Sequence, residues 1–334
     1  MILIFTNKAD AHPTNVIKHL ISWGVPVFRL NTECLLSDYE FSWWCNERDC
    51  DFYIKNRHTQ AELYGHEITA IWDRRPFEPE TLLIQSEDEK TNKFMLEEAI
   101  GFLQFLRFYL RDIYSIGSIV EDRPAASKML QLSIAKKLGA KIPDTVFSNT
   151  KSAFIPMLQR HNEISLKPIG ADGFFTNDDM EYVFYSRKAI SNEILAQPNE
   201  AFNQTACFLQ NYVKKKHELR ITVCNQDIVA CKIDSQILDD DKGKIDWRQG
   251  YDYGLKQEIV DIPYEIKVFC TTFLKKMRIN FGCFDFIVTP NEEYVFLECN
   301  PNGQWLWIEL ATGYDISKIV AKNLAKFEKT DSLL

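Results

Sequence analysis

The chain opens with short apolar runs on either side of an amphipathic segment. Residues 1–5 form a continuous apolar run, residues 14–23 carry apolar positions at helical spacing, and Gly24 separates them from a second apolar run at 25–30. Short apolar runs bounded by polar residues are typical of buried strands, and a 3.6-residue period is typical of a helix that packs against them. The pattern predicts a βαβ unit.

Further along, two more strands and one long helix are predicted before residue 115. The strand candidates are 40–45 and 68–72, and apolar positions at helical spacing between 94 and 110 predict a core helix that ends near Arg111. The second strand ends abruptly in a polar run that Pro76 closes. Charged residues at the end of a strand often face a functional site.

The middle of the chain has its own set of elements. Asp122 can cap, and Pro124 can occupy the first turn of, a helix that runs through Lys137 and is stopped by Gly139. A strand at 145–148, a helix at 152–160 and a strand at 164–167 follow this helix.

The last third is rich in strands. The expected strands are 207–212, 219–224, 228–233, 283–288 and 294–298. One helix, 264–277, precedes the last hairpin, and the acidic run 239–243 is expected to be a mobile loop. The pattern predicts an α+β protein with a terminal antiparallel sheet.

Composition narrows the classes of function. A length of 334 residues with 46% apolar residues suggests two or three domains, and a net charge of −8 provides no basic surface for a phosphate backbone. The longest apolar segment contains Glu97, Glu98 and Arg107, which a bilayer would not accept, and no signal peptide is recognisable. We therefore expect neither nucleic acid nor a membrane as a partner.

Cysteine usage indicates the compartment. Nine cysteines, an odd number, are spread through a long chain, so a disulfide framework is not expected. Cys45 and Cys50 are the closest pair, but they lack the partners that a structural zinc site needs. The pattern is typical of buried or half-buried free thiols in a reducing cytoplasm.

The most informative segment lies in the last predicted hairpin. Asp285 and Glu298 fall on neighbouring antiparallel strands and can point to one face, with the amide oxygen of Asn300 two residues further along that face. The apolar neighbours of these residues indicate that the strands are buried, where unpaired carboxylates are costly. Three hard oxygen ligands at one place favour Mg²⁺ over a solvated hairpin.

In this segment the chain resembles the ATP-grasp ligases, whose last strands carry an acidic residue and a Glu-x-Asn pair as magnesium ligands. By the same resemblance, Lys128 and Lys167 match the two lysines that reach the nucleotide phosphates. Gly170 and Gly173 would let a loop close over phosphate. The residue before Lys128 is commonly asparagine in that family and is Ser127 here.

The resemblance continues into the expected nucleotide hinge. Residues 210–213 look like the segment whose backbone bonds adenine, and their members are Gln210, Asn211, Tyr212 and Val213. Asn211 departs from the acidic residue frequent there. Glu218 matches the ribose-binding acid, and Arg220 matches the residue that faces the transferred phosphoryl group.

A narrower resemblance is carried by the run from Asn300 to Glu309. It is similar to the graspetide (microviridin-type) peptide macrocyclases, and most similar to the grasp-with-spasm maturases. The runs 71–76, 232–236 and 246–248 agree with it, so the resemblance spans nearly the entire chain. It implies a pre-ATP-grasp-like domain at 1–118, a central ATP-grasp subdomain at 119–205, and a C-terminal domain with the metal site at 206–330.

The resemblance also implies an activity. ATP would phosphorylate an Asp or Glu side chain of a ribosomally made precursor peptide, with leader and core, and a Ser or Thr hydroxyl or a Lys amine would then attack the acyl phosphate. Arg248 is expected to grip the substrate acid, or else to pair with Asp246, while Arg74 and Arg75 orient the peptide. ATP and Mg²⁺ are the expected cofactors, and a homodimer is left open.

Two other functions remain open at this point. One is an ATP-grasp ligase that joins an amino acid to a small carboxylate or to a peptide end. The other is a nucleotide-binding protein without catalysis, against which the complete magnesium triad argues. The general base is not identified, and Asp234 and the 239–241 run are its only candidates.

Overall fold

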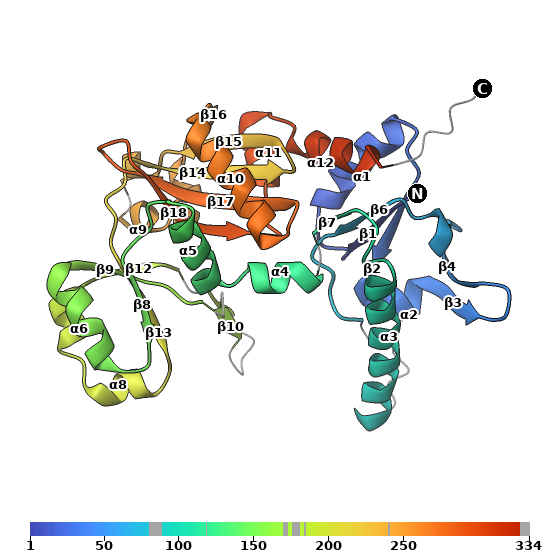
Figure 1. The fold of residues 1–334 in the computed structure, drawn as a ribbon, viewed down its shortest axis with the longest axis horizontal. Helices are drawn as coiled ribbons and strands as arrows, with labels where there is room; N and C mark the ends of the chain where they lie inside the picture. Colours follow the sequence, from blue (N-terminus) through green and yellow to red (C-terminus); the bar gives the residue numbers. More distant parts are fainter. Residues whose placement is uncertain are drawn as a thin grey trace.

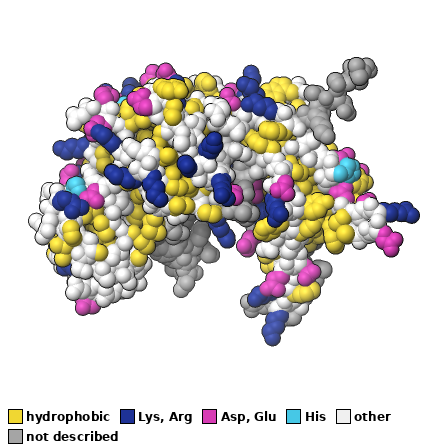
Figure 2. All heavy atoms as spheres, viewed as in Figure 1, with side chains coloured by type: hydrophobic (Ala, Val, Ile, Leu, Met, Phe, Trp, Pro, Cys, Tyr) yellow, Lys and Arg dark blue, Asp and Glu magenta, His cyan; other side chains and the backbone are white. Residues whose placement is uncertain are grey.

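The computed structural model describes residues 1–79, 89–117, 119–169, 173–175, 181–183, 185–239 and 241–327. Helices and strands alternate along the chain and form the three successive regions seen in Figure 1. On the face shown in Figure 2, Lys and Arg side chains are spread over both halves of the molecule, among acidic and hydrophobic ones. The predicted α+β fold is confirmed.

The N-terminal region is built on a parallel sheet of order β2-β1-β6-β7. Its strands are β1 (Ile2–Thr6), β2 (Val27–Asn31), β6 (Ala70–Asp73) and β7 (Ser115–Ile116). Between β1 and β2 lies helix α1 (His12–Ser22), with Pro13 in its first turn. The predicted βαβ unit is therefore confirmed, with the helix starting two residues earlier than expected.

Alternation along β1 separates two cores. Ile2 and Ile4 pack with α1 on one face, whereas Leu3 and Phe5 pack with α3 (Glu89–Tyr109) on the other. The predicted helix at 94–110 is confirmed, but Phe94 was expected to lie on its core face and is 62% exposed.

A small antiparallel sheet, β3-β4-β5, adds to the second of these cores. Its strands are β3 (Tyr39–Cys45), β4 (Cys50–Asn56) and β5 (Glu62–Tyr64), and short helical elements flank it, namely η1 (Thr32–Cys34), α2 (Leu35–Asp38) and η2 (Gly65–Glu67). All nine cysteines are free. Cys45 and Cys50 lie opposite each other in the β3–β4 hairpin as free thiols. Both are exposed, so the expectation of buried or half-buried thiols is wrong for these two.

The central region carries an antiparallel sheet of order β12-β9-β13-β8. Its strands are β8 (Thr145–Ser148), β9 (Glu163–Leu166), β12 (Arg187–Ile190) and β13 (Cys207–Asn211). The other elements of this region are α6 (Lys151–Arg160), the β10 (Gly173–Phe175) and β11 (Glu181–Val183) pair, α7 (Ser191–Leu195) and α8 (Asn199–Asn203). Gly170 lies outside the described residues, so the glycine loop stays a prediction.

The helix expected from Asp122 to Lys137 is two helices. Helix α4 (Ile119–Ala125) contains Pro124, and α5 (Lys128–Lys137) starts afresh after Ser127. Ser127 has an extended backbone, and its hydroxyl accepts from the N–H of Leu130, so it caps α5. Asp122 therefore does not cap the helix that carries Lys128.

The C-terminal region is a five-stranded antiparallel sheet of order β16-β15-β14-β17-β18. Its strands are β14 (His217–Cys224), β15 (Asp227–Ile233), β16 (Gln257–Val260), β17 (Phe281–Val288) and β18 (Tyr294–Asn300). Helices α5 and α10 (Tyr264–Met277) pack on one face of it. The expected loop at 239–243 is partly helical, because α9 begins at Asp241 and runs to Ile245; Asp240 lies outside the described residues.

The opposite face of this sheet shares one hydrophobic core with the N-terminal region. Trp72 of β6 and Trp305 lie in it with no more than 1% exposure, together with α11 (Leu306–Thr312) and α12 (Ile316–Ala325). Figure 1 shows α12 beside α1. Within the described residues, no helix has the length and apolar character needed to cross a bilayer.

Candidate functional site

A cavity of about 690 Å³ is lined by both the central and the C-terminal sheets. All the predicted site residues except Arg74 line it, and these are Arg75, Lys128, Lys167, Gln210, Asn211, Tyr212, Val213, Glu218, Arg220, Arg248, Asp285, Glu298 and Asn300. A second cavity of about 450 Å³, beside Asp73 and Arg107, contains none of them. The structure therefore brings together residues that lie up to 225 positions apart in the chain.

One row of charged side chains crosses three strands of the C-terminal sheet. Arg220 on β14 lies opposite Asp285 on β17, which lies opposite Glu298 on β18. A β-bulge follows directly, because Phe286 pairs with Phe296 and leaves Leu297 as the extra residue. The expectation that both carboxylates share one face is confirmed by this register.

Asp285 is held by an arginine. Arg220 donates from one terminal nitrogen to both carboxylate oxygens of Asp285, at 2.8 and 2.7 Å. Burial opposes the charge of Arg220, but the Asp285 carboxylate outweighs it and raises the pKa of the guanidinium. Burial raises the pKa of Asp285 in turn, and the charge of Arg220 opposes this rise.

Two lysines face Glu298. Lys128 lies with its Nζ 3.3 Å from Glu298 Oε2 and donates to the carbonyl of Pro168 at 3.1 Å. Burial alone would raise the pKa of Glu298, but Lys128 and Lys167 hold it below its ordinary value. Burial lowers the pKa of Lys167, with the nearby charge of Lys128 adding to this and Glu298 opposing it. The cations here outnumber the carboxylates that face them.

The residues fit a magnesium ion through their donor chemistry. Glu298 supplies a carboxylate oxygen, Asn300 an amide oxygen, and Asp285 a second carboxylate, and hard oxygens are the ligands that Mg²⁺ prefers. Asn300 Nδ2 lies 3.4 Å from Asp285 Oδ2, so amide and carboxylate are adjacent. Among the described residues, no three Asp, Glu, His or Cys side chains form a metal-binding group.

The predicted hinge follows β13 along the cavity wall. The backbone N–H groups of Asn211 and Tyr212 are already bonded to the carbonyls of Asp144 and Glu163, at 3.0 and 2.9 Å. In the part of the chain that the structure describes, the N–H of Val213 has no hydrogen-bond partner. The unused N–H of this half-buried residue can donate to a ligand in the cavity.

Glu218 is buried with an unexpected partner. Lys215 donates to Glu218 at 2.5 Å and to the carbonyl of Ile245 at 2.7 Å, and the hydroxyl of Ser235 bonds the other carboxylate oxygen. Burial raises the pKa of Glu218 despite Lys215. Sequence reasoning missed Lys215, whose only signal was its place in the lysine run 214–216 just before the predicted acid.

Arg248 forms an ion pair with Asp246, which the sequence left open as the alternative to binding the substrate acid. Its guanidinium bonds both oxygens of Asp246, at 2.9 and 2.6 Å, and lies 5.7 Å from the ring centre of Tyr185. Its side chain is still 49% exposed and lines the cavity, so the pairing leaves part of the fork accessible. Asp234 and Asp239, the candidates for a base, do not line the cavity.

Solved structures resemble this arrangement over nearly all of the chain. A RiPP-associated ATP-grasp ligase of Chryseobacterium gregarium, solved with ADP and with a leader and core peptide, is 27% identical, with a TM-score of 0.87 over 97% of this chain and 96% of that one. The chain is therefore an ATP-dependent ligase with the ATP-grasp fold.

Other comparisons agree with the fold of this ligase. The macrocyclase MdnC of Microcystis aeruginosa MRC, solved with its precursor peptide MdnA, is 24% identical with a TM-score of 0.81 over 97% of this chain and 99% of that one. D-cycloserine synthetase DcsG reaches a TM-score of only 0.55 at 13% identity, with 98% and 99% of the two chains covered. No family model and no curated sequence matches the chain.

The two arginines after β6 in this ligase have different surroundings. Arg74 is 1% exposed and bonds Asp10 and the 302–303 backbone, so a direct contact with peptide, as expected from the sequence, is wrong for it. Arg75 lines the cavity and has a left-handed backbone with φ 48°, which costs a non-glycine residue about 1–2 kcal/mol. Asn7 Nδ2 donates to its carbonyl at 2.7 Å and helps to hold this conformation.

Proposed function

We propose that this ligase is an ATP-dependent macrocyclase of a ribosomally made precursor peptide. The observation that carries the proposal is one cavity lined by a carboxylate and amide set, by two lysines near Glu298 and by a partly exposed arginine. The likeness to a ligase solved with ADP, leader and core peptide supports the substrate class. A cytoplasmic site of action belongs to the same proposal and is supported by the free thiols.

In this proposal the nucleotide lies along the cavity wall between the two sheets. The unused N–H of Val213 donates to adenine, Glu218 accepts from the ribose, and Lys128 and Lys167 face the phosphates. Glu298, Asn300 and Asp285 are the residues that hold Mg²⁺. The ion, when bound, neutralises charge on the phosphate oxygens.

The reaction then follows from the charges in the cavity. An oxygen of a substrate Asp or Glu side chain attacks the γ-phosphorus of ATP, and the bond to ADP breaks, which leaves an acyl phosphate. A Ser or Thr hydroxyl or a Lys amine of the same peptide attacks the acyl carbon and loses its proton, and inorganic phosphate leaves. Lys128, Lys167 and Arg220 stabilise the charge that develops during phosphoryl transfer. Both reacting groups belong to one bound peptide, so ring closure is effectively unimolecular.

The substrate carboxylate needs a fixed cation, because it must approach a polyanionic nucleotide. Arg248 supplies one at the cavity wall, oriented by Asp246, and Arg75 supplies a second from the N-terminal region. A planar fork can bind a carboxylate at two points, which a lysine cannot do.

The experiment compares Arg248→Lys with the wild type on a precursor peptide that the wild-type protein modifies. We expect slower loss of water from the peptide by mass spectrometry, with ATP affinity unchanged. Arg187→Lys, at an exposed position on β12, is the matched control and should modify peptide normally. Normal peptide modification by Arg248→Lys would remove this arginine from substrate binding. ATP turnover that no peptide stimulates would contradict the macrocyclase assignment as a whole.

A further inference from the structure

The turn 302–306, which follows strand β18, is hydrogen-bonded to side chains of the N-terminal region. Arg74 donates to the carbonyls of Asn302 and Gly303, at 2.8 and 2.9 Å. Its guanidinium also lies 5.2 Å from the ring centre of Trp305. Because Arg74 is 1% exposed, these bonds are formed away from competing water.

A histidine of the same region bonds the backbone of the two residues that follow Gln304. The backbone N–H groups of Trp305 and Leu306 both point at His12 Nε2, each at 3.2 Å. Nε2 must therefore carry the lone pair, and the proton lies on Nδ1, which donates to Asp10 Oδ1 at 2.7 Å. The other oxygen of Asp10 accepts from Arg74 Nε at 2.8 Å.

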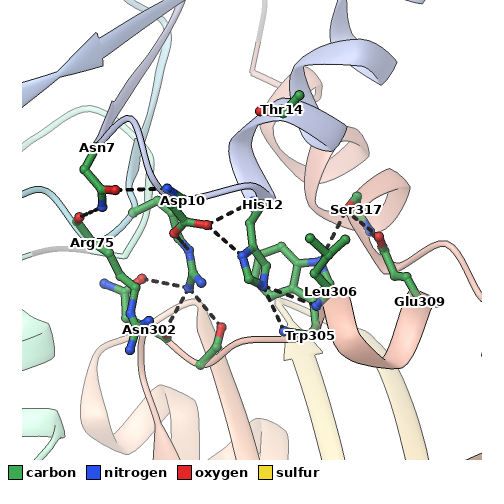
Figure 3. A network of polar contacts seen from close by, with 12 residues as sticks. Asn7, Asp10, His12, Thr14, Arg75, Asn302, Trp305, Leu306, Glu309 and Ser317 are labelled. Atoms are coloured by element: carbon green, nitrogen blue, oxygen red, sulfur yellow. Dashed lines mark hydrogen bonds and ion pairs between the residues drawn. The ribbon is translucent and has the colours of Figure 1, made fainter. Parts of the chain in front are cut away.

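Asp10, His12 and Arg74 thus form one buried unit, which we call the N-terminal clamp. Figure 3 shows Asp10 and His12 reaching from the N-terminal region toward Asn302, Trp305 and Leu306. Asn302 adds a reverse contact, since its Nδ2 donates to the carbonyl of Asp73 at 3.2 Å. The turn is bonded to the clamp at four backbone positions, 302, 303, 305 and 306.

The 302–306 turn follows closely after Asn300, which is a proposed metal ligand. The N–H of Gly303 donates to the carbonyl of Asn300 at 3.1 Å, so the turn closes directly on that residue. A Cβ at Gly303 would lie 2.3 Å from Cys283 Cβ, so the turn is seated tightly on β17. From the sheet side, Arg220 is 3.4 Å from the carbonyl of Gln304. The turn therefore has little freedom to rotate Asn300.

We propose that the N-terminal clamp is a positioning device for the metal site, which fixes the 302–306 turn and thereby aims the amide of Asn300 at Mg²⁺. The inference rests on the proposed function, because it takes Asn300 and Glu298 as metal ligands. In this proposal, Arg74 and His12 affect the reaction by positioning Asn300, and neither residue contacts the peptide or the nucleotide. Groups that orient metal ligands in this way commonly change metal affinity by about 10–100-fold when they are replaced.

Two substitutions of His12 separate positioning from mere folding. In His12→Gln the amide oxygen reaches roughly the place of Nε2 and can still accept from the turn. In His12→Asn the amide lies near Nδ1, so the contact with Asp10 can persist while the two N–H groups of Trp305 and Leu306 lose their acceptor. Arg74→Lys keeps a charge but cannot bridge Asp10 and both carbonyls.

The measurement is the affinity for ADP by calorimetry, with and without Mg²⁺, in the full-length protein. We expect His12→Asn and Arg74→Lys to reduce the Mg²⁺-dependent gain in affinity by about 10-fold or more, the range for residues that orient ligands. The Mg²⁺-free affinity should stay within about 2-fold, and His12→Gln should lie closer to the wild type. Leu63→Ala, in the distant β5 strand, is the control for lost thermal stability and should leave the gain unchanged.

The outcomes are distinct from those of the proposed function. If Glu298→Gln keeps the full Mg²⁺-dependent gain, the metal assignment itself is wrong. If Glu298→Gln loses the gain while His12→Asn and Arg74→Lys keep it, only the clamp is overturned. Equal effects of His12→Asn and His12→Gln would also overturn it, because the acceptor at Nε2 would then have no special role.

Discussion

The ATP-grasp cavity and the junction between the N-terminal and C-terminal regions differ in the balance between their positive and negative side chains. In the cavity, Lys128 and Lys167 face the single carboxylate of Glu298, which leaves cationic charge for a ligand. At the junction, Asp10 bonds both His12 and Arg74, and the surrounding core is apolar, with Trp305 fully buried.

The difference separates binding from positioning. A site that binds a polyanion must contain more positive than negative charge. This excess of buried positive charge lowers the stability of the protein while no ligand is bound. A junction that is to fix geometry must pair its buried charges with one another, as Asp10 does with Arg74, although Arg74 Nη2 has no hydrogen-bond partner in the described part of the chain. Substitutions in the cavity should accordingly affect ligand-dependent properties, whereas substitutions at the junction should lower stability as well as act on the metal site through the turn.

The largest effect is expected at the proposed metal ligands. Glu298→Gln and Asn300→Ala each remove a hard oxygen, and a metal ion contributes several kcal/mol to phosphoryl transfer, so ATP turnover should fall by about 100-fold or more. Glu293→Gln, in the exposed hairpin turn, is the control for loss of a carboxylate. Wild-type turnover in both ligand variants would refute the assignment.

The second effect is on stability at the junction. Trp305 is fully buried between Trp72, Phe281 and His12, and Trp305→Ala should lower the free energy of unfolding by about 3–5 kcal/mol. Trp43, which is 51% exposed, is the control, and Trp43→Ala should cost far less. Similar urea midpoints for the two variants would show that the shared core does not hold the two regions together.

The third effect is on nucleotide affinity. Lys128→Ala or Lys167→Ala should weaken ATP binding by about 1.5–3 kcal/mol, the range for bonds to charged groups, whereas exposed cations contribute about 0–1 kcal/mol. Lys137→Ala, at the exposed end of the same helix α5, is the matched control for Lys128. Calorimetry in which Lys128→Ala and Lys137→Ala bind ATP equally would assign Lys128 to the solvated surface.

Strand patterning explains why so much of the cavity could be predicted. The period of two along β17 and β18 places Asp285 and Glu298 on one face whatever the rest of the fold is, and the hairpin sets their register. Glu218 and Arg220 lie two residues apart on β14 and therefore share a face, but their roles were predicted from the resemblance to the ATP-grasp ligases. Local rules were sufficient for Asp285 and Glu298 because these two residues belong to adjacent strands.

The junction could not be predicted in this way. Arg74 looks like any charged residue after a strand, and only the tertiary fold shows that it meets a turn 228 residues later in the chain. His12 has no sequence signal either, since its partners are backbone N–H groups of Trp305 and Leu306. The split between α4 and α5 was missed because Ser127 competes with Asp122 as a cap.

The smallest expected effect is a pH dependence of stability at the clamp. Burial lowers the pKa of His12 and outweighs the neighbouring Asp10, which raises it, while Arg74 and Arg75 add to the lowering. Below pH 6.5 the unfolded chain then binds a proton at His12 that the folded chain does not bind, so stability falls as the pH falls from 7 to 5. The contribution is at most about 1.4 kcal/mol per pH unit. His12→Gln should flatten this slope in urea unfolding at pH 7, 6 and 5.

His66 provides the contrast that tests the sign. Its bond to Asp51 raises the pKa of an imidazole whose side chain is 71% exposed, so its stabilising contribution is present below pH 6.5 and is lost as the pH rises through the folded value. His66→Gln should therefore change the slope in the direction opposite to His12→Gln. Slopes that change in the same direction in the two variants would mean that His12 is not kept neutral by its burial at the clamp.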